Sequence, residues 1–147
     1  MTLPALETPP DTEKSLCLPA ELKHLPTVLA HVRQMAESAG VVGAQASRLE
    51  LAVEEALVNV CHYAYADCAE SGLLYCRIAV RPNGIWVEIA DEGPPFNPLA
   101  QPDPDTALEL DQRKPGGLGI LLIKKLVSEI AYRREDGRNV LAIGMLT

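Results

Sequence analysis

Hydrophobic side chains recur at steps of three and four between Leu49 and Tyr65, a stretch without Gly or Pro. At roughly 100° per residue these positions share one helix face. We therefore predict an amphipathic helix that begins near residues 43–47 and ends by Asp67. Its opposite face carries three polar side chains at spacings of four and three, from Glu55, Asn59 and His62. The helix alone leaves two interpretations open, a solvated face or the wall of a site.

Two further elements are predicted ahead of this helix. Residues 15–18 (SLCL) suit a short strand that ends at Pro19, and apolar positions in residues 21–40 step helically. Pro26 fits the first turn of that second element, and Gly40 fits its C-terminal stop. Residues 1–14 are rich in Pro and Thr, so we expect a flexible N-terminal tail, with one domain over residues 15–147.

The C-terminal half reads as two hairpins that flank a helix. Two mostly apolar runs flank the Asn-Gly turn of residues 81–84, and a second pair flanks Asp136–Gly137. Between the hairpins, Leu118–Ile130 has the pattern of a helix. The order of strand, two helices, hairpin, loop, helix and hairpin predicts an α+β fold. It is a two-layer sandwich, in which helices cover a mostly antiparallel sheet.

Composition narrows the class of protein. At 147 residues and 48% hydrophobic, the chain can bury one core, and its net charge of −7 argues against a broad basic surface for nucleic acid. The four cysteines form no CxxC pair, which favours reduced thiols. Neither an export signal nor a run of 18 apolar residues is present, so we expect a cytoplasmic protein without a membrane span.

Three separated features suggest a nucleotide site. Glu55 and Asn59 lie one helical turn apart, Asp91 is expected at the end of a strand, and the glycine-rich turn Gly116–Gly119 leads into a helix. Such a turn lets backbone amides approach phosphates. A strand-end carboxylate can accept a hydrogen bond from an exocyclic amine, and an Asn oxygen suits Mg²⁺. The irregular loop after Ala90 holds six of the twelve prolines, which indicates disorder or a functional lid.

These features resemble the boxes of the GHKL ATPases, the group of gyrase, Hsp90, MutL and histidine kinases. EALVN at 55–59 resembles the N box, and DEGPPFNP at 91–98 resembles the G1 box of anti-sigma-factor serine kinases of the RsbW and SpoIIAB type. GGLGI at 116–120 resembles their G2 box. The likeness covers residues 15–146 and implies the Bergerat ATP-binding fold of that family.

The resemblance also implies roles for individual residues. Glu55 would be the catalytic general base, and Asn59 would bind Mg²⁺ between the phosphates. Asp91 would bind the adenine amine, and Gly93 would allow the base to approach. Arg113 or Lys114 would either meet the γ-phosphate or remain solvated loop charge. The full set of implied nucleotide contacts is Asn59, Asp91, Gly93, Phe96, Lys114, Gly116, Gly117, Leu118, Gly119 and Asn139.

Three positions depart from the family pattern. Pro95 replaces the second glycine of a typical G1 box, as in the kinase-type members, and removes a backbone donor. His62 lies three residues after Asn59, where some members have a histidine four residues on, so we interpret it as a helix-face residue. Asn139 stands where some members place a Thr that touches the phosphates; its amide is still able to donate a hydrogen bond.

Partners and activity follow from the same resemblance. It implies an ATP- and Mg²⁺-dependent protein serine/threonine kinase that phosphorylates a STAS-domain anti-anti-sigma protein and sequesters a sigma factor or another regulated protein. A homodimer is typical of such kinases, with the first strand and first helix at the interface, and neither nucleic acid nor a membrane is expected as a direct partner. The alternative is an ATP-binding switch protein that binds its partners without phosphorylating them.

Overall fold

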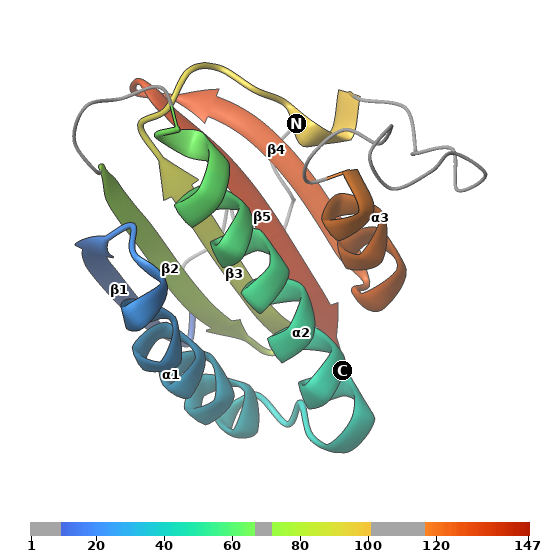
Figure 1. Cartoon of the computed structure of the whole chain (residues 1–147). Coiled ribbons are helices and arrows are strands. Elements are labelled where there is room, and N and C mark those ends of the chain that lie inside the picture. The colour runs from blue at the N-terminus through green and yellow to red at the C-terminus, as the bar shows by residue number, and fades with distance from the viewer. Residues whose placement is uncertain (1–9, 67–71, 101–116) are drawn as a thin grey trace.

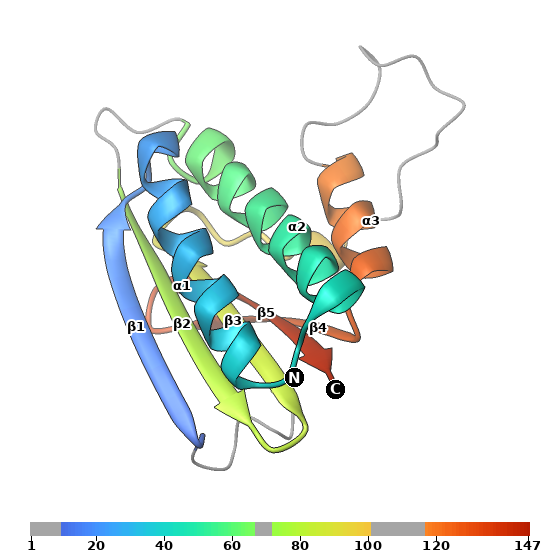
Figure 2. The ribbon, with the colours of Figure 1, turned by 90° about the horizontal axis from the view of Figure 1, so that it is seen from below.

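A computed structural model describes residues 10–66, 72–100 and 117–147. It shows a five-stranded sheet in the order β1-β2-β3-β5-β4, with every neighbouring pair antiparallel. Helices α1, α2 and α3 lie side by side on one face of the sheet (Figures 1 and 2). The predicted α+β sandwich is therefore confirmed. The strands are β1 (Thr12–Pro19), β2 (Leu73–Arg81), β3 (Gly84–Asp91), β4 (Glu129–Glu135) and β5 (Arg138–Leu146), and the helices are α1 (Leu25–Ser38), α2 (Gly43–Asn59) and α3 (Gly117–Leu126).

The core lies between the sheet and the helices. Strand β3 turns Ile85, Val87 and Ile89 toward it, because alternate side chains of a strand share a face. Helix α2 meets them with the predicted apolar positions, and Leu49 and Leu57 have no exposed surface. The central helix therefore lies with its apolar face on the sheet, which leaves Glu55 and Asn59 on its less buried side.

Both predicted hairpins are confirmed, and their register sets up the candidate site. Asp136 and Gly137 adopt positive φ angles of 52° and 77°, which a tight Asp-Gly turn requires. Across the sheet, Asp91 of β3 pairs with Asn139 of β5, and Asn139 pairs with Arg134 of β4. Directly paired residues point to the same side, so these three side chains form a row on the helix-facing side.

Two element boundaries differ from the prediction. The first strand begins at Thr12 rather than Ser15 and pairs along its whole length with β2. The third helix ends at Leu126, so its predicted extension to Ile130 is wrong. Ile130 belongs to β4 and pairs with Ile143, because a short apolar run fits a strand as well as a helix and the neighbouring strand decides. Residues 12–14, which were expected in the flexible tail, belong to β1, so the domain begins earlier than predicted. Residues 1–9 lie outside the described residues, and there the tail stays a prediction.

The central helix does not end as a regular α-helix. Val60–Ala64 forms a π-helical turn, η3, directly after α2. A π turn closes i→i+5 hydrogen bonds and occurs frequently at functional sites. The sequence does not predict this π turn, because hydrophobic spacing over five residues does not distinguish a π turn from an α turn.

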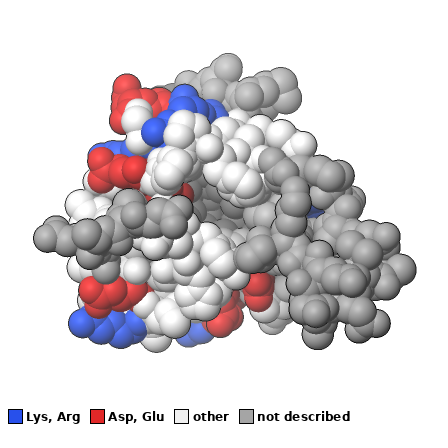
Figure 3. Space-filling view, turned by 45° about the horizontal axis from the view of Figure 1, so that its top comes forward, with Lys and Arg blue, Asp and Glu red and all other residues white. Residues whose placement is uncertain are grey.

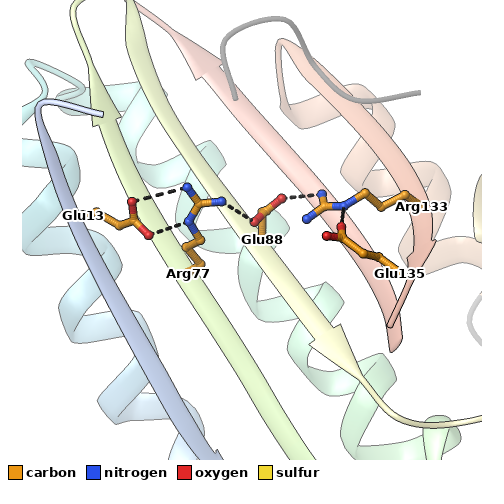
Figure 4. Close-up of polar contacts among 5 residues, drawn as sticks. All are labelled: Glu13, Arg77, Glu88, Arg133 and Glu135. Carbon is orange, nitrogen blue, oxygen red and sulfur yellow. Dashed lines mark hydrogen bonds and ion pairs between the residues drawn. The ribbon is translucent and has the colours of Figure 1, made fainter. Parts of the chain in front are cut away.

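The outer face of the sheet, away from the helices, carries a ladder of ion pairs across the strands (Figure 4). Buried Glu88 accepts hydrogen bonds from Arg77 on one side and Arg133 on the other. These arginines also bind Glu13 and Glu135, respectively, so charge alternates along the ladder. None of the helices in the described parts of the chain is long and apolar enough to cross a membrane.

Candidate functional site

The first wall of the site is formed by helices α2 and α3. A Cβ atom built on Gly119 would lie 3.1 Å from Glu55 Oε2 and 3.3 Å from Asn59 Nδ2. The glycine in the first turn of α3 therefore faces the two polar residues that the sequence placed on one side of α2. A larger residue at position 119 would fill the space beside the carboxylate and the carboxamide.

The second wall is the turn that follows β3. Asp91 is only 8% exposed, and its Oδ1 accepts hydrogen bonds from Gly93 N–H at 2.9 Å and from Asn139 Nδ2 at 3.0 Å. Hydrogen bonds to both donors fix the carboxylate in one orientation. A Cβ on Gly93 would lie 2.4 Å from the Ala64 carbonyl oxygen, so the turn packs directly on the end of η3. The continuous stretch from Glu55 to Ala64 thus contacts α3 at one end and the turn after β3 at the other.

Asn139 holds this turn rather than pointing away from it. Its Nδ2 donates to Asp91 and to the Pro94 carbonyl at 2.9 Å, and its Oδ1 accepts from Phe96 N–H at 3.0 Å and Tyr132 O–H at 2.6 Å. The hydrogen bonds of Asn139 therefore go to the turn and its neighbours. The sequence suggested that this amide would serve the phosphates. In the structure it stabilises the Asp91 side of the site.

Of the remaining predicted site residues, the structure describes some and not others. Phe96 is 57% exposed, and Gly117 and Leu118 open helix α3. Arg113, Lys114 and Gly116 lie outside the described residues. His62 is exposed on η3, where its ring meets the Tyr63 ring edge to face, as a helix-face residue would.

Sequence reasoning missed three residues that hold the turn. Arg134 donates to the Gly93 carbonyl at 2.8 Å, Tyr65 accepts from Glu92 N–H at 2.7 Å, and Tyr75 donates to the Glu92 carboxylate at 2.7 Å. Strand register would have found Arg134, since it pairs with Asn139. Tyr65 had no signal, because its position depends on the π turn.

The donor set fits a nucleotide with a divalent cation. No group of three or more His, Cys, Asp or Glu side chains among the described residues would hold a metal alone. Mg²⁺ needs no such cage, because it is usually held by one or two protein oxygens together with phosphates and water. Asn59, which lies beside Glu55 and against Gly119, offers such an oxygen.

Figure 3 shows mostly uncharged described residues near the middle of the view, and the charged side chains lie toward the left and lower edges. A separate hollow of about 350 Å³ lies on the outer face of the sheet, where Tyr75, Arg77, Glu88 and Arg138 are among its lining residues. Its Arg77 and Arg133 are already paired with glutamates of the ion-pair ladder, and the carboxylates of Glu88 and Glu135 in its lining disfavour a phosphate. The site between α2, α3 and the β3 turn is the better nucleotide candidate.

Residues 18–145 match the histidine kinase-like ATPase domain family. The chain is 28% identical to the serine/threonine-protein kinase BtrW of Bordetella bronchiseptica over 65% of this chain and 66% of that protein. It is 30% identical to the serine-protein kinase RsbW of Bacillus velezensis over 84% of this chain and 79% of that protein.

A solved structure also resembles this one. The crystal structure of the RsbU and RsbW domains of a Mycobacterium tuberculosis protein gives a TM-score of 0.64 at 17% identity. The match covers 93% of this chain and 33% of that chain. At this identity the likeness shows that the two share a fold.

Proposed function

Because the chain belongs to the histidine kinase-like ATPase domain family, we propose that it is an ATP-dependent protein serine kinase of the RsbW type. The observation that carries this proposal is the placement of Gly119 against Glu55 and Asn59. It brings a glycine-rich helix start, a carboxylate and an amide oxygen together from separate parts of the chain. Relatives named as serine-protein kinases support the same activity.

The nucleotide would lie between the two walls. Asp91 would accept a hydrogen bond from the adenine amine, and Gly93 would let the turn pack closely on η3 at the side of the base. Gly117 and Gly119 bring backbone N–H groups and the positive end of the α3 dipole to the phosphates. Asn59 would hold Mg²⁺, which would neutralise charge that develops on the phosphates.

Glu55 acts on the acceptor. Its carboxylate takes the proton of a serine hydroxyl in the partner protein, and the serine oxygen forms a bond to the γ-phosphorus. The bond from that phosphorus to the bridging oxygen breaks, and ADP leaves with the electron pair. Positioning and charge stabilisation supply most of the rate, because phosphoryl transfer requires little covalent chemistry from the protein.

The acceptor we propose is a STAS-domain anti-anti-sigma protein, and the protein sequestered is a sigma factor or another regulated protein. The kinase would act as a homodimer, with β1 and α1 at the interface. A net charge of −7 suits contact with proteins rather than with nucleic acid.

The test is transfer of label from [γ-³²P]ATP, with Mg²⁺, to a STAS-domain protein. Glu55→Ala should abolish transfer and leave ATP affinity within a few-fold of wild type. Glu54→Ala is the matched control, because Glu54 is an exposed carboxylate on the same helix that does not face Asn59, and it should transfer label normally. A wild-type chain that binds the STAS protein and ATP without transfer would favour a non-catalytic switch instead.

A further inference from the structure

Tyr65 joins three parts of the fold through one side chain. Its ring lies against Gly72, where a Cβ atom would come within 2.1 Å of the ring carbons Cε1 and Cζ. Its hydroxyl donates to the Leu73 carbonyl at 2.6 Å and accepts from Glu92 N–H at 2.7 Å. The phenol is therefore fixed at its ring and on both sides of its oxygen.

The group it holds is the middle peptide of the candidate adenine turn. Pairing between β3 and β5 ends at Asp91, so the Glu92 N–H lies just beyond the ladder and finds its partner in Tyr65. The Glu92 side chain is exposed and is held at its carboxylate by Tyr75 O–H, whereas its backbone N–H is held by Tyr65. Gly93 N–H and Asn139 Nδ2 orient the Asp91 carboxylate, and Glu92 joins Asp91 to Gly93. A fixed Glu92 peptide therefore keeps Gly93 N–H where it can hold Asp91.

The same hydroxyl ties the base side of the site to the phosphate side. Tyr65 follows η3, and η3 follows Asn59 without interruption. One continuous stretch of chain thus carries Glu55 and Asn59 at one end and the clamp on the adenine turn at the other. Burial raises the pKa of Tyr65, so the phenol stays protonated at neutral pH and both donates and accepts.

We propose that Tyr65 is a positioning residue for nucleobase selection, which rests on the ATP-binding function proposed above. Its hydroxyl holds the Glu92 peptide so that the Asp91 carboxylate meets the exocyclic amine of adenine. The residue does not touch the nucleotide. Its contribution is therefore to the choice between bases, beyond any contribution to stability.

The test compares ATP with inosine triphosphate, which carries a carbonyl oxygen in place of the adenine amine. Dissociation constants are measured for both nucleotides with the full chain, in wild type, Tyr65→Phe and Tyr63→Phe. Tyr65→Phe keeps the ring on Gly72 and removes only the hydroxyl, and its preference for ATP should fall by about three- to tenfold. Tyr63→Phe removes an exposed hydroxyl two residues away and should keep the wild-type preference.

The outcomes separate the two proposals. If wild type binds neither nucleotide, the ATP function fails, and the role of Tyr65 fails with it. If wild type prefers ATP and Tyr65→Phe keeps that preference undiminished, the role of Tyr65 alone is refuted, whatever the melting temperature does. If Tyr65→Phe does not fold, hydrogen exchange of the backbone amides in wild type tests the hydrogen bond between Tyr65 and Glu92 instead. The Glu92 amide should be protected from exchange, and rapid exchange there would overturn the clamp.

Discussion

The substitution Gly119→Ala tests the contact between α2 and α3 on which the phosphate wall depends. The new methyl group would lie 3.1 Å from Glu55 Oε2, below the 3.4 Å at which ordinary van der Waals contact begins. The carboxylate must therefore retreat by about 0.3 Å, which a flexible side chain can do. We expect the protein to fold normally but to transfer phosphate slowly.

The magnitudes of the two effects differ. Ala is favoured over Gly in a helix by up to about 1 kcal/mol, which offsets the cost of moving Glu55. The free energy of unfolding should thus change by less than about 1 kcal/mol. Misplacement of a reacting group by 1 Å can cost about 100-fold in rate, so 0.3 Å together with a methyl group in the phosphate space should lower kcat by about tenfold.

A double-mutant cycle isolates the contact. Unfolding in urea is measured for wild type, Gly119→Ala, Glu55→Ala and the double variant. The kcat of label transfer is compared between wild type and Gly119→Ala only, because Glu55→Ala is expected to abolish transfer. Without the Glu55 side chain the methyl group meets less resistance, so Gly119→Ala should stabilise the Glu55→Ala protein more than the wild type. Equal effects in both backgrounds, or an unchanged kcat in Gly119→Ala, would refute the placement of Gly119 against Glu55.

Three other predictions concern the turn, the outer face and the thiols. Gly93→Ala should weaken ATP binding at least tenfold and destabilise the fold by about 1–3 kcal/mol in titration and urea unfolding, because its methyl group meets a backbone carbonyl. Hydrogen bonds from Arg77 and Arg133 lower the pKa of Glu13 and Glu135. These ion pairs therefore stabilise the fold fully above about pH 4.5, and this stabilisation is lost as pH falls through the lowered pKa values. A melting temperature that does not fall below about pH 4.5 would contradict this. Burial raises the pKa of Cys76 to about 12, so at pH 8 a thiol reagent should modify exposed Cys17 and spare Cys76 until the chain unfolds.

The sequence was sufficient for the parts of the fold that have strong local signals. The turn signals at residues 81–84 and 136–137 predicted both hairpins, although the first hairpin turns at residues 82–83 and Gly84 already belongs to β3. The apolar spacing of α2 predicted which face meets the sheet. The end of α3 was wrong, because Ile130 fits either a helix or a strand until Ile143 pairs with it. Local pattern carries no information about that partner.

The site divides in the same way. Glu55, Asn59, Asp91 and Gly119 were predicted as members of one site, and the structure brings Gly119 to Glu55 and Asn59, and Gly93 to the end of η3. The contacts that hold the turn were not predictable, because they depend on strand register and on the π turn after Asn59. Asn139 shows the difference, since its hydrogen bonds to the turn follow from its pairing with Asp91.

Titration of the full chain with ATP and Mg²⁺, followed by amide NMR, tests the central claim most directly. ATP between the two walls should shift the amide signals of Gly93 and Gly119 with one dissociation constant. Gly84, at the far end of β3 from Asp91, should not move. Shifts at both glycines with Gly84 unchanged are the predicted result. Absence of binding, or shifts confined to the outer face of the sheet, would contradict the account.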